Sequence, residues 1–273
     1  MKVAIICDTF PPFKSSAAIQ MGDLARGFVE NKFNTSVFVP DSSIKPSYQH
    51  FKKDGVNIFR IKSPNLKNIP FLKRAFNESI LPFVLIKNIF FSNINKRDYD
   101  LIIWYSPSIF LWPLVLYLKT LNRCSSYLIL RDIFPNWALD LGLIKRGPPY
   151  FYFKFVEYFQ YFVADKIGVQ TKSNLEYFQG ILKPISKKTE VLNNWLTKYD
   201  DIDEQKRFDF DLPEEKKILI YSGNMGKAQN LKLWMDLARK NEQKYFFIFI
   251  GRGSEKEILE RTAKKNNSKN ILF

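Results

Sequence analysis

Short apolar runs, most of them separated by enough residues for a helix, recur along the N-terminal part of the chain. The first run, Val3–Cys7, precedes a proline-bearing loop, and apolar residues then follow at helical spacing from Ala17 to Val29. This pattern predicts a strand, a loop and a helix. Six further strands are predicted at Val37–Val39, Val56–Ile61, Leu101–Tyr105, Tyr127–Leu130, Ile167–Gln170 and Glu190–Leu192. Seven such strands predict a parallel sheet in one Rossmann-like domain.

The same alternation begins again near the C-terminal end of the chain. The apolar run Ile218–Tyr221 leads into small residues, and Leu231, Trp234, Met235 and Ala238 then recur at helical spacing. A further run, Tyr245–Ile250, ends in a glycine-bearing segment, and 270–273 reads as the start of another strand. We therefore expect a second α/β unit.

A charge-dense stretch without apolar periodicity, 199–217, separates the two patterns. We assign residues 1–198 to an N-terminal Rossmann-like domain, 199–217 to a connection, and 218–273 to a C-terminal Rossmann-like domain. The last segment has about half the length that such a domain needs, so we expect the second domain to be incomplete.

Two glycine-bearing segments are expected to leave neighbouring parallel strands at their carboxyl ends, where doubly wound sheets bind ligands. One contains Gly223, Asn224 and Lys227, and the other is Gly251-Arg252-Gly253. Glycines let the backbone approach a phosphate, and a helix N-terminus favours an anion. The alternative is that both segments are ordinary strand-to-helix turns.

Charge and composition narrow the class of partner. Lys and Arg outnumber Asp and Glu by 42 to 27, giving a net charge of +15, which favours nucleic acid, anionic lipid or phosphorylated substrates. The loop Cys7–Ser16 contains no glycine, which disfavours an NAD-binding fingerprint. Cys7 and Cys124 have neither disulfide nor metal spacing, so no metal site is expected. No signal peptide or membrane-spanning run is found, which predicts a cytoplasmic protein.

Several motifs resemble the GT-B glycosyltransferases of family 4, and among these the bacterial enzymes that build surface polysaccharides. The motifs are FPP at 10–12, LARGF at 24–28, RDIFPNWALDLGL at 131–143, VLNNW at 191–195, SGNMGKAQNL at 222–231 and GRGSEKE at 251–257. The resemblance implies two Rossmann-like domains facing a cleft, with the acceptor on the first and a nucleotide-sugar on the second. It also implies sugar transfer with retention of configuration and without a cofactor.

The resemblance suggests site residues. Ser15 and Ser16 stand where the family usually has a glycine pair, so they are candidates for donor binding, although Ser at this position also caps helices. Asp132 is the leading catalytic candidate, with Arg131 as the alternate; a structural ion pair is the competing interpretation. Asn224 and Gln229 replace the family's Arg and Lys, so Lys227 is a candidate to supply the missing charge.

Two aromatic stretches receive different interpretations. Leu66–Arg97 mixes apolar groups with cations and is predicted to lie on an anionic membrane, although cations on the outer face of a packed helix are the alternative. Tyr150–Phe162 is predicted to be core rather than a nucleic-acid stacking surface. His50, the only histidine, is expected on the surface of a polar loop.

The leading interpretation is a retaining hexosyl- or hexosaminyltransferase that acts on a polyprenyl-linked acceptor at the inner face of the cell membrane. A rival is a non-catalytic, basic, membrane-associated module or a truncated remnant of such an enzyme. The family's acidic pair, which contacts the sugar and the ribose, has no counterpart in this sequence, so we expect these 273 residues to bind donors weakly. Nucleic-acid binding is disfavoured because no recognition motif accompanies the charge.

Overall fold

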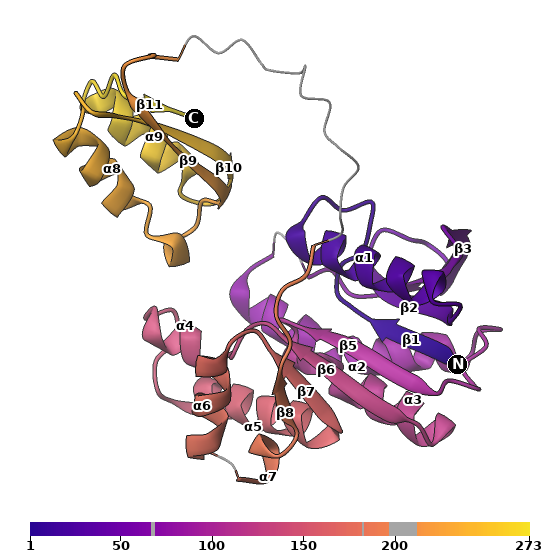
Figure 1. Cartoon of the computed structure of the whole chain (residues 1–273). Helices are drawn as coiled ribbons and strands as arrows, with labels where there is room; N and C mark the ends of the chain where they lie inside the picture. Colours follow the sequence, from indigo (N-terminus) through magenta and orange to yellow (C-terminus); the bar gives the residue numbers. More distant parts are fainter. Residues whose placement is uncertain (67–68, 182, 197–211) are drawn as a thin grey trace. The chain divides into compact units, whose positions relative to one another are not determined.

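The computed structural model describes residues 1–66, 69–181, 183–196 and 212–273. The chain divides into two compact units, Met1–Lys198 and Tyr199–Phe273, and each has its own sheet (Figure 1). Most of the expected connection, 199–211, lies outside the described residues. The α/β fold class inferred from the sequence is confirmed in both units.

The sheet of the first unit has the strand order β3-β4-β2-β1-β5-β6-β7-β8. All neighbouring strands run parallel except β3 and β4, which are antiparallel. The strands are β1 (Lys2–Ile6), β2 (Asn34–Asp41), β3 (Tyr48–Lys53), β4 (Val56–Lys62), β5 (Leu101–Ser106), β6 (Ser125–Leu130), β7 (Lys166–Val169) and β8 (Thr189–Val191). The seven strands expected from apolar runs are thus confirmed.

The edge strand β3 corrects the sequence interpretation, which placed His50 in a polar loop. His50 lies within this strand, and its ring stacks on Phe59 with the ring centroids 4.5 Å apart. The turn that joins β3 to β4 has positive φ angles at Asp54 (51°) and Gly55 (77°), the conformation of a tight hairpin. A Cβ at Gly55 would lie 2.6 Å from a methyl carbon of Val29. Both the positive φ and this close contact therefore favour glycine at the position.

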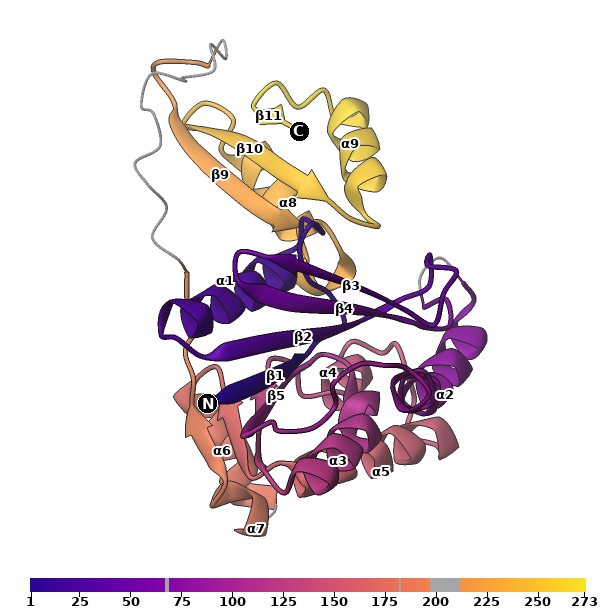
Figure 2. The same ribbon diagram turned by 90° about the vertical axis from the view of Figure 1, so that its right-hand side faces the viewer.

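Helices cover both faces of this sheet because strands buried on both sides need an apolar layer on each. In β1, Val3 and Ile5 face the cluster that includes Met21 of α1, whereas Ala4 and Ile6 face the larger cluster on the other side. The helices are α1 (Ser16–Glu30), α2 (Phe71–Phe90), η1 (Ile109–Leu111), α3 (Trp112–Asn122), α4 (Asn136–Asp140), α5 (Pro148–Val163), α6 (Lys172–Ile181) and α7 (Lys183–Ser186). Figure 2 shows α2, α3 and α5 together on the face opposite to α1.

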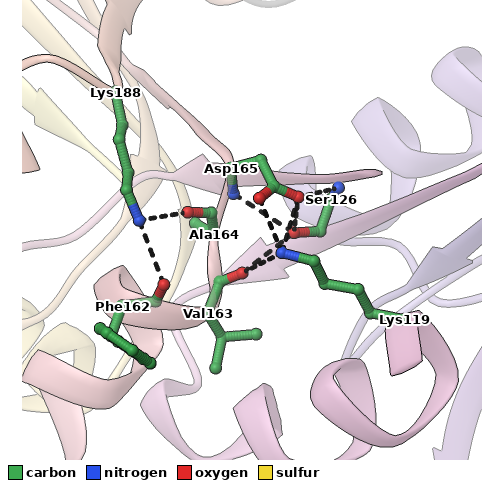
Figure 3. Close-up of polar contacts among 7 residues, drawn as sticks. All are labelled: Lys119, Ser126, Phe162, Val163, Ala164, Asp165 and Lys188. Atoms are coloured by element: carbon green, nitrogen blue, oxygen red, sulfur yellow. Dashed lines mark hydrogen bonds and ion pairs between the residues drawn. The ribbon is translucent and has the colours of Figure 1, made fainter. Parts of the chain in front are cut away.

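A polar cluster at the amino ends of β6 and β7 fixes the C-terminus of α5 (Figure 3). The Lys119 ammonium donates to the Val163 carbonyl at 3.0 Å and to the Asp165 carboxylate at 2.7 Å. The Lys188 ammonium donates to the Ala164 carbonyl at 2.8 Å, and the Ser126 N–H donates to Asp165 at 2.8 Å. Cations therefore satisfy the last carbonyls of α5, which have no partners within the helix.

The second unit is a three-stranded parallel sheet with the order β11-β10-β9. Its elements are β9 (Lys217–Asn224), η2 (Lys227–Gln229), α8 (Lys232–Lys240), β10 (Tyr245–Arg252), α9 (Lys256–Lys265) and β11 (Ile271–Leu272). Met235 of α8 and Leu259 of α9 join one apolar cluster with Phe247 and Phe249. Ile220 and Ile250 lie on the opposite face of the sheet and are exposed.

Candidate active site

The first unit gathers several polar side chains at the carboxyl edge of its parallel strands. Asp8 follows β1, Ser106 ends β5, Arg131 and Asp132 follow β6, and Gln170 follows β7. These strands are neighbours in the order β1-β5-β6-β7, so their carboxyl ends meet at one edge. In open α/β sheets this is the edge at which ligands bind.

Arg131 is the best-anchored residue of this edge. Its carbonyl accepts a hydrogen bond from Gln170 Nε2 at 3.0 Å, and its guanidinium lies over the ring of Trp195, 4.8 Å from the centroid. Nη1 approaches the Leu192 carbonyl at 3.5 Å. Nε and Nη2 are buried and make no hydrogen bond of ordinary geometry to a described residue, although the Tyr105 hydroxyl is close enough to interact with the guanidinium. Two buried N–H groups in this state favour an anionic oxygen as their partner.

Trp195 connects this edge to the first helix. Its indole Nε1 donates to the Gln20 carbonyl of α1 at 3.1 Å, and the side chains of Gln20 and Asn194 are 3.4 Å apart. The VLNNW segment therefore holds the Arg131 guanidinium between β6 and α1. The sequence resemblance drew attention to this segment, but nothing in it indicated a stacking role for Trp195.

Asp132 is exposed, and its side chain does not hold the Arg131 guanidinium, which points to the 192–195 segment. Partial desolvation raises the pKa of Asp132, and the nearby charge of Arg131 opposes that rise. The geometry thus gives no support to a structural ion pair between these two neighbours. An exposed carboxylate at a strand end remains available to a ligand.

Tyr105 and Cys7 belong to the same electrostatic neighbourhood, although the sequence interpretation assigned them no role beyond their strands. Burial raises the pKa of Tyr105 to about 12; the Arg131 charge lowers it, whereas Asp8 and Asp132 raise it further. Burial and the charge of Asp8 raise the pKa of the Cys7 thiol well above its usual value. A thiol that stays protonated is a poor nucleophile. The signal for Tyr105 was its position as the last apolar residue of a predicted strand.

The motif at 131–143 is positioned by a hydroxyl–amide network. The Asn136 amide donates to the Tyr177 hydroxyl of α6, and the Tyr150 hydroxyl of α5 donates to Asn136 Oδ1 at 3.3 Å. Helices α5 and α6 therefore hold the segment that follows Arg131 and Asp132. The sequence alone did not reveal this network because its members are far apart along the chain.

Ser15 and Ser16 begin α1 on the same side of the sheet. Ser15 is the N-cap, and its hydroxyl accepts a hydrogen bond from the Ala18 N–H at 3.2 Å. Helix capping, the alternative reading of Ser15, is therefore present in the structure. Ser16 is exposed as the first residue of the helix, where free backbone N–H groups favour an anion.

In the second unit, the structure corrects the positions of the glycine-bearing segments. Gly223 and Asn224 belong to β9, and Gly251 and Arg252 belong to β10, rather than to loops. Gly251 pairs with Gly223, and a Cβ at Gly251 would lie 1.8 Å from the Gly223 carbonyl oxygen. A Cβ at Gly253 would lie 2.3 Å from the Met225 carbonyl oxygen. Close approach of two backbones accounts for these two glycines.

Hydrogen bonds to the Gln229 side-chain amide hold the segment that follows β9. Gln229 Oε1 accepts from Asn224 Nδ2 at 3.1 Å and from the Gly226 N–H at 3.2 Å. The two residues at which the related family has cations therefore hold each other. Lys227 is exposed at the start of η2. Among the described residues, no group of three His, Cys, Asp or Glu is placed to hold a metal ion.

Comparison with solved structures covers both units. The chain matches sucrose-phosphate synthase from Thermosynechococcus elongatus with a TM-score of 0.71 and 11% identity, over 100% of this chain and 70% of that chain. It matches Staphylococcus aureus TarM, solved with UDP and alpha-GlcNAc-glycerol, with a TM-score of 0.62 and 10% identity, over 100% and 76% of the two chains. The chain has the GT-B fold.

One relative found by sequence comparison is also named as a glycosyl transferase. Over 183 residues the chain is 26% identical to an Escherichia coli K12 protein named as the colanic acid biosynthesis glycosyl transferase WcaI. The match covers 64% of this chain and 45% of the relative, so the GT-B chain spans less than half of that protein. No family model matches. The GT-B fold that the resemblance implied is confirmed by the solved structures.

Proposed function

We propose that this protein is a retaining glycosyltransferase that moves a hexosyl or hexosaminyl group from a nucleotide-sugar to a lipid-linked acceptor in surface-polysaccharide synthesis, such as that of O-antigen or capsule. The observation that carries the proposal is the match to GT-B structures along the whole chain. The relative named for colanic acid biosynthesis supports the same product class. TarM was solved with UDP, which makes UDP-sugars the first donors to test.

Donor-binding residues are proposed in each unit separately: at the start of α1 in the first, and after β9 and β10 in the second. Lys227 supplies the positive charge after β9, and the Asn224 amide supplies a polar group beside it. Backbone N–H groups at the strand ends contribute the remaining donors to the diphosphate. The proposed donor-binding residues are Ser15, Ser16, Gly223, Asn224, Lys227, Gly251, Arg252 and Gly253.

Transfer is assigned to the carboxyl edge of the first sheet. The buried Nε and Nη2 groups of Arg131 bind an anionic oxygen of a substrate, and the Asp132 carboxylate accepts a hydrogen bond from a sugar hydroxyl. A bond forms between the acceptor oxygen and the anomeric carbon while the bond from that carbon to the diphosphate breaks. The leaving diphosphate takes the proton of the attacking hydroxyl, so no protein nucleophile takes part.

A membrane surface is the proposed setting for this reaction because the acceptor is attached to a polyprenyl lipid. The stretch Leu66–Arg97 supports this setting, since Lys73, Lys87 and Arg97 are exposed along it. Such cations attract anionic lipids with about 1 kcal/mol per residue near the surface. The site is therefore proposed to work at the inner face of the cell membrane.

A non-catalytic, basic, membrane-associated module is the alternative. The observation that favours it is the contact between Asn224 and Gln229, which replaces two cations of the related family by a neutral pair. A donor diphosphate then meets one exposed cation, Lys227, in this segment. The two proposals differ in whether nucleotide-sugars bind.

Titration calorimetry with a panel of UDP- and ADP-sugars separates them. We expect one donor to bind, and Lys227→Met to weaken its binding about tenfold, because a charge-assisted hydrogen bond contributes roughly 1.5–3 kcal/mol. Lys240→Met, at the exposed end of α8, is the matched control and should bind as the wild type does. Absence of binding by the whole panel would favour the non-catalytic module.

A further inference from the structure

Helix α5 carries a row of exposed aromatic rings, which corrects the sequence interpretation of this segment as core. Phe151, Phe155, Tyr158 and Phe162 are 65%, 61%, 46% and 63% exposed, and their spacing of four, three and four residues places them on one stripe. The buried side of the helix consists of Val156, Glu157, Gln160, Tyr161 and Val163. Many of the aromatic residues of α5 therefore lie outside the core.

Helix α2 carries a second stripe of the same kind. Leu72, Phe76, Phe83 and Phe90 recur at four- and seven-residue spacing and are 88%, 63%, 61% and 55% exposed. Ser79 falls on this stripe by the same spacing. We call these eight side chains the α2–α5 surface: Leu72, Phe76, Phe83 and Phe90 from α2, and Phe151, Phe155, Tyr158 and Phe162 from α5.

The two stripes adjoin on one side of the first unit. The Ser79 hydroxyl of α2 is 2.7 Å from the Tyr152 hydroxyl of α5. Trp112 of α3 stacks on Phe159 of α5 with the ring centroids 5.1 Å apart. Figure 2 shows the three helices on the same side of the sheet. The two stripes therefore lie on the same side of the first unit, and each places several apolar side chains in one row.

Charge around this surface selects among partners. The acidic residue of α2, Glu78, is paired with Arg74 at 2.9 Å, and that of α5, Glu157, is buried and bonded to Tyr161 at 2.8 Å. Exposed cations flank the stripes at Lys73 and Lys87 of α2 and, just before α5, at Lys145 and Arg146. Aromatic groups beside cations, without a free carboxylate, match the acyl and headgroup layers of an anionic bilayer.

We propose that the α2–α5 surface lies in the interfacial layer of an anionic membrane, with its phenylalanine rings among the acyl chains and its cations at the phosphates. Among the described residues, none of the helices has the length and apolar character needed to span a bilayer. Because Tyr150 of α5 is bonded to Asn136, the docked helix directly supports the motif at 131–143. The inference rests on the proposed function for the lipid-linked acceptor and specifies how the protein meets that lipid.

Vesicle co-sedimentation of the full chain tests this inference. Vesicles of equal parts phosphatidylglycerol and phosphatidylcholine should bind the wild type, and pure phosphatidylcholine vesicles should bind it less. The vesicle partition coefficient of the double variant Phe155→Ser with Phe162→Ser should be lower than that of the wild type by about tenfold or more, because two rings no longer bury apolar surface in the bilayer. Lys73→Gln with Lys87→Gln should reduce binding and its dependence on salt.

The matched control changes two equally exposed apolar residues of the second unit, Leu233→Ser with Ile258→Ser, which are 64% and 60% exposed. It should bind as the wild type does, and circular dichroism should show that all variants are folded. Equal binding by the Phe155 and Phe162 double variant would overturn the inference. The inference would also be overturned if the wild type did not bind vesicles but formed a dimer that the double variant cannot form. The vesicles carry no sugar acceptor, so a failure of sugar transfer would leave this result unchanged.

Discussion

At the residue scale, the carboxyl edge of the first sheet is built around Arg131. Its carbonyl is held by Gln170 and its guanidinium by the Trp195 ring, while two of its N–H groups are buried and make no hydrogen bond of ordinary geometry to a described residue. Burial lowers the pKa of Arg131, and the nearby Tyr105 hydroxyl opposes that change. The guanidinium stays charged, because an Arg pKa in a protein remains far above neutral. An anion is therefore the expected partner.

Asp132→Asn tests the role of the neighbouring carboxylate. We expect turnover to fall about 10- to 100-fold, because a hydrogen bond to a charged group contributes roughly 1.5–3 kcal/mol. The melting temperature should change little, since Asp132 is exposed. Asp140→Asn, an exposed carboxylate in the same motif, is the control for both measurements. A loss of stability as large as the loss of turnover would assign Asp132 a structural role.

Gly251→Ala tests the correction made in the second unit. The new Cβ would lie 1.8 Å from the Gly223 carbonyl oxygen, and Gly251 has a φ of +154°. We expect the unfolding free energy of the second unit to fall by about 2 kcal/mol or more. Gly27→Ala in α1 is the control, because its Cβ meets nothing within 4 Å and alanine favours a helix. Similar urea midpoints for the two variants would contradict the strand pairing described for β9 and β10.

At the scale of elements, apolar periodicity predicted every buried strand, because a strand covered on both faces reads as a continuous apolar run. β3 escaped prediction because an exposed edge strand needs few apolar residues, although the Asp54-Gly55 turn was a readable hairpin signal. The sequence prediction placed the aromatic residues of α5 in the core because apolar residues at helical spacing do not show whether their side of the helix is buried or exposed. Pairing across strands, which brings Gly251 against Gly223, is not visible along the chain.

The polar cluster at the end of α5 gives a pH-dependent prediction. Burial raises the pKa of Asp165, but hydrogen bonds from Lys119 and Ser126 lower it more, so the folded value lies below the ordinary one. A carboxylate with a depressed pKa stabilises the fold above its unfolded pKa of about 3.9, and this contribution is lost as the pH falls through the folded value. Asp165→Asn should therefore lower the melting temperature at neutral pH.

The difference between Asp165→Asn and the wild type should shrink as the pH is lowered below about 4. Thermal unfolding followed by circular dichroism across this range measures it. Asp140→Asn, which removes an exposed carboxylate of the motif at 131–143, is measured in parallel as the control. A constant gap between Asp165→Asn and the wild type down to the lowest pH would mean that packing, rather than the charge, is what the substitution removes.

At the scale of the whole molecule, the two units differ in how their sheets are covered by helices. The first has a sheet covered on both faces and a polar carboxyl edge, whereas the second has both helices on one face of three strands. The family resemblance implied two Rossmann-like domains, and the GT-B matches agree with that fold. The substrates could not be predicted from the sequence, because Asn224 and Gln229 depart from the family pattern that would have indicated how the donor is bound.

The most direct test of the central claim is a transfer assay with the full-length protein, the donor selected by calorimetry, and a polyprenyl-diphosphate-linked sugar as acceptor. The anomeric configuration of the product is read by NMR. The account predicts a glycosidic product that retains the configuration of the donor and a slower reaction for Asp132→Asn than for Asp140→Asn. Vesicle binding without donor binding or product would contradict it and identify the protein as a non-catalytic membrane module.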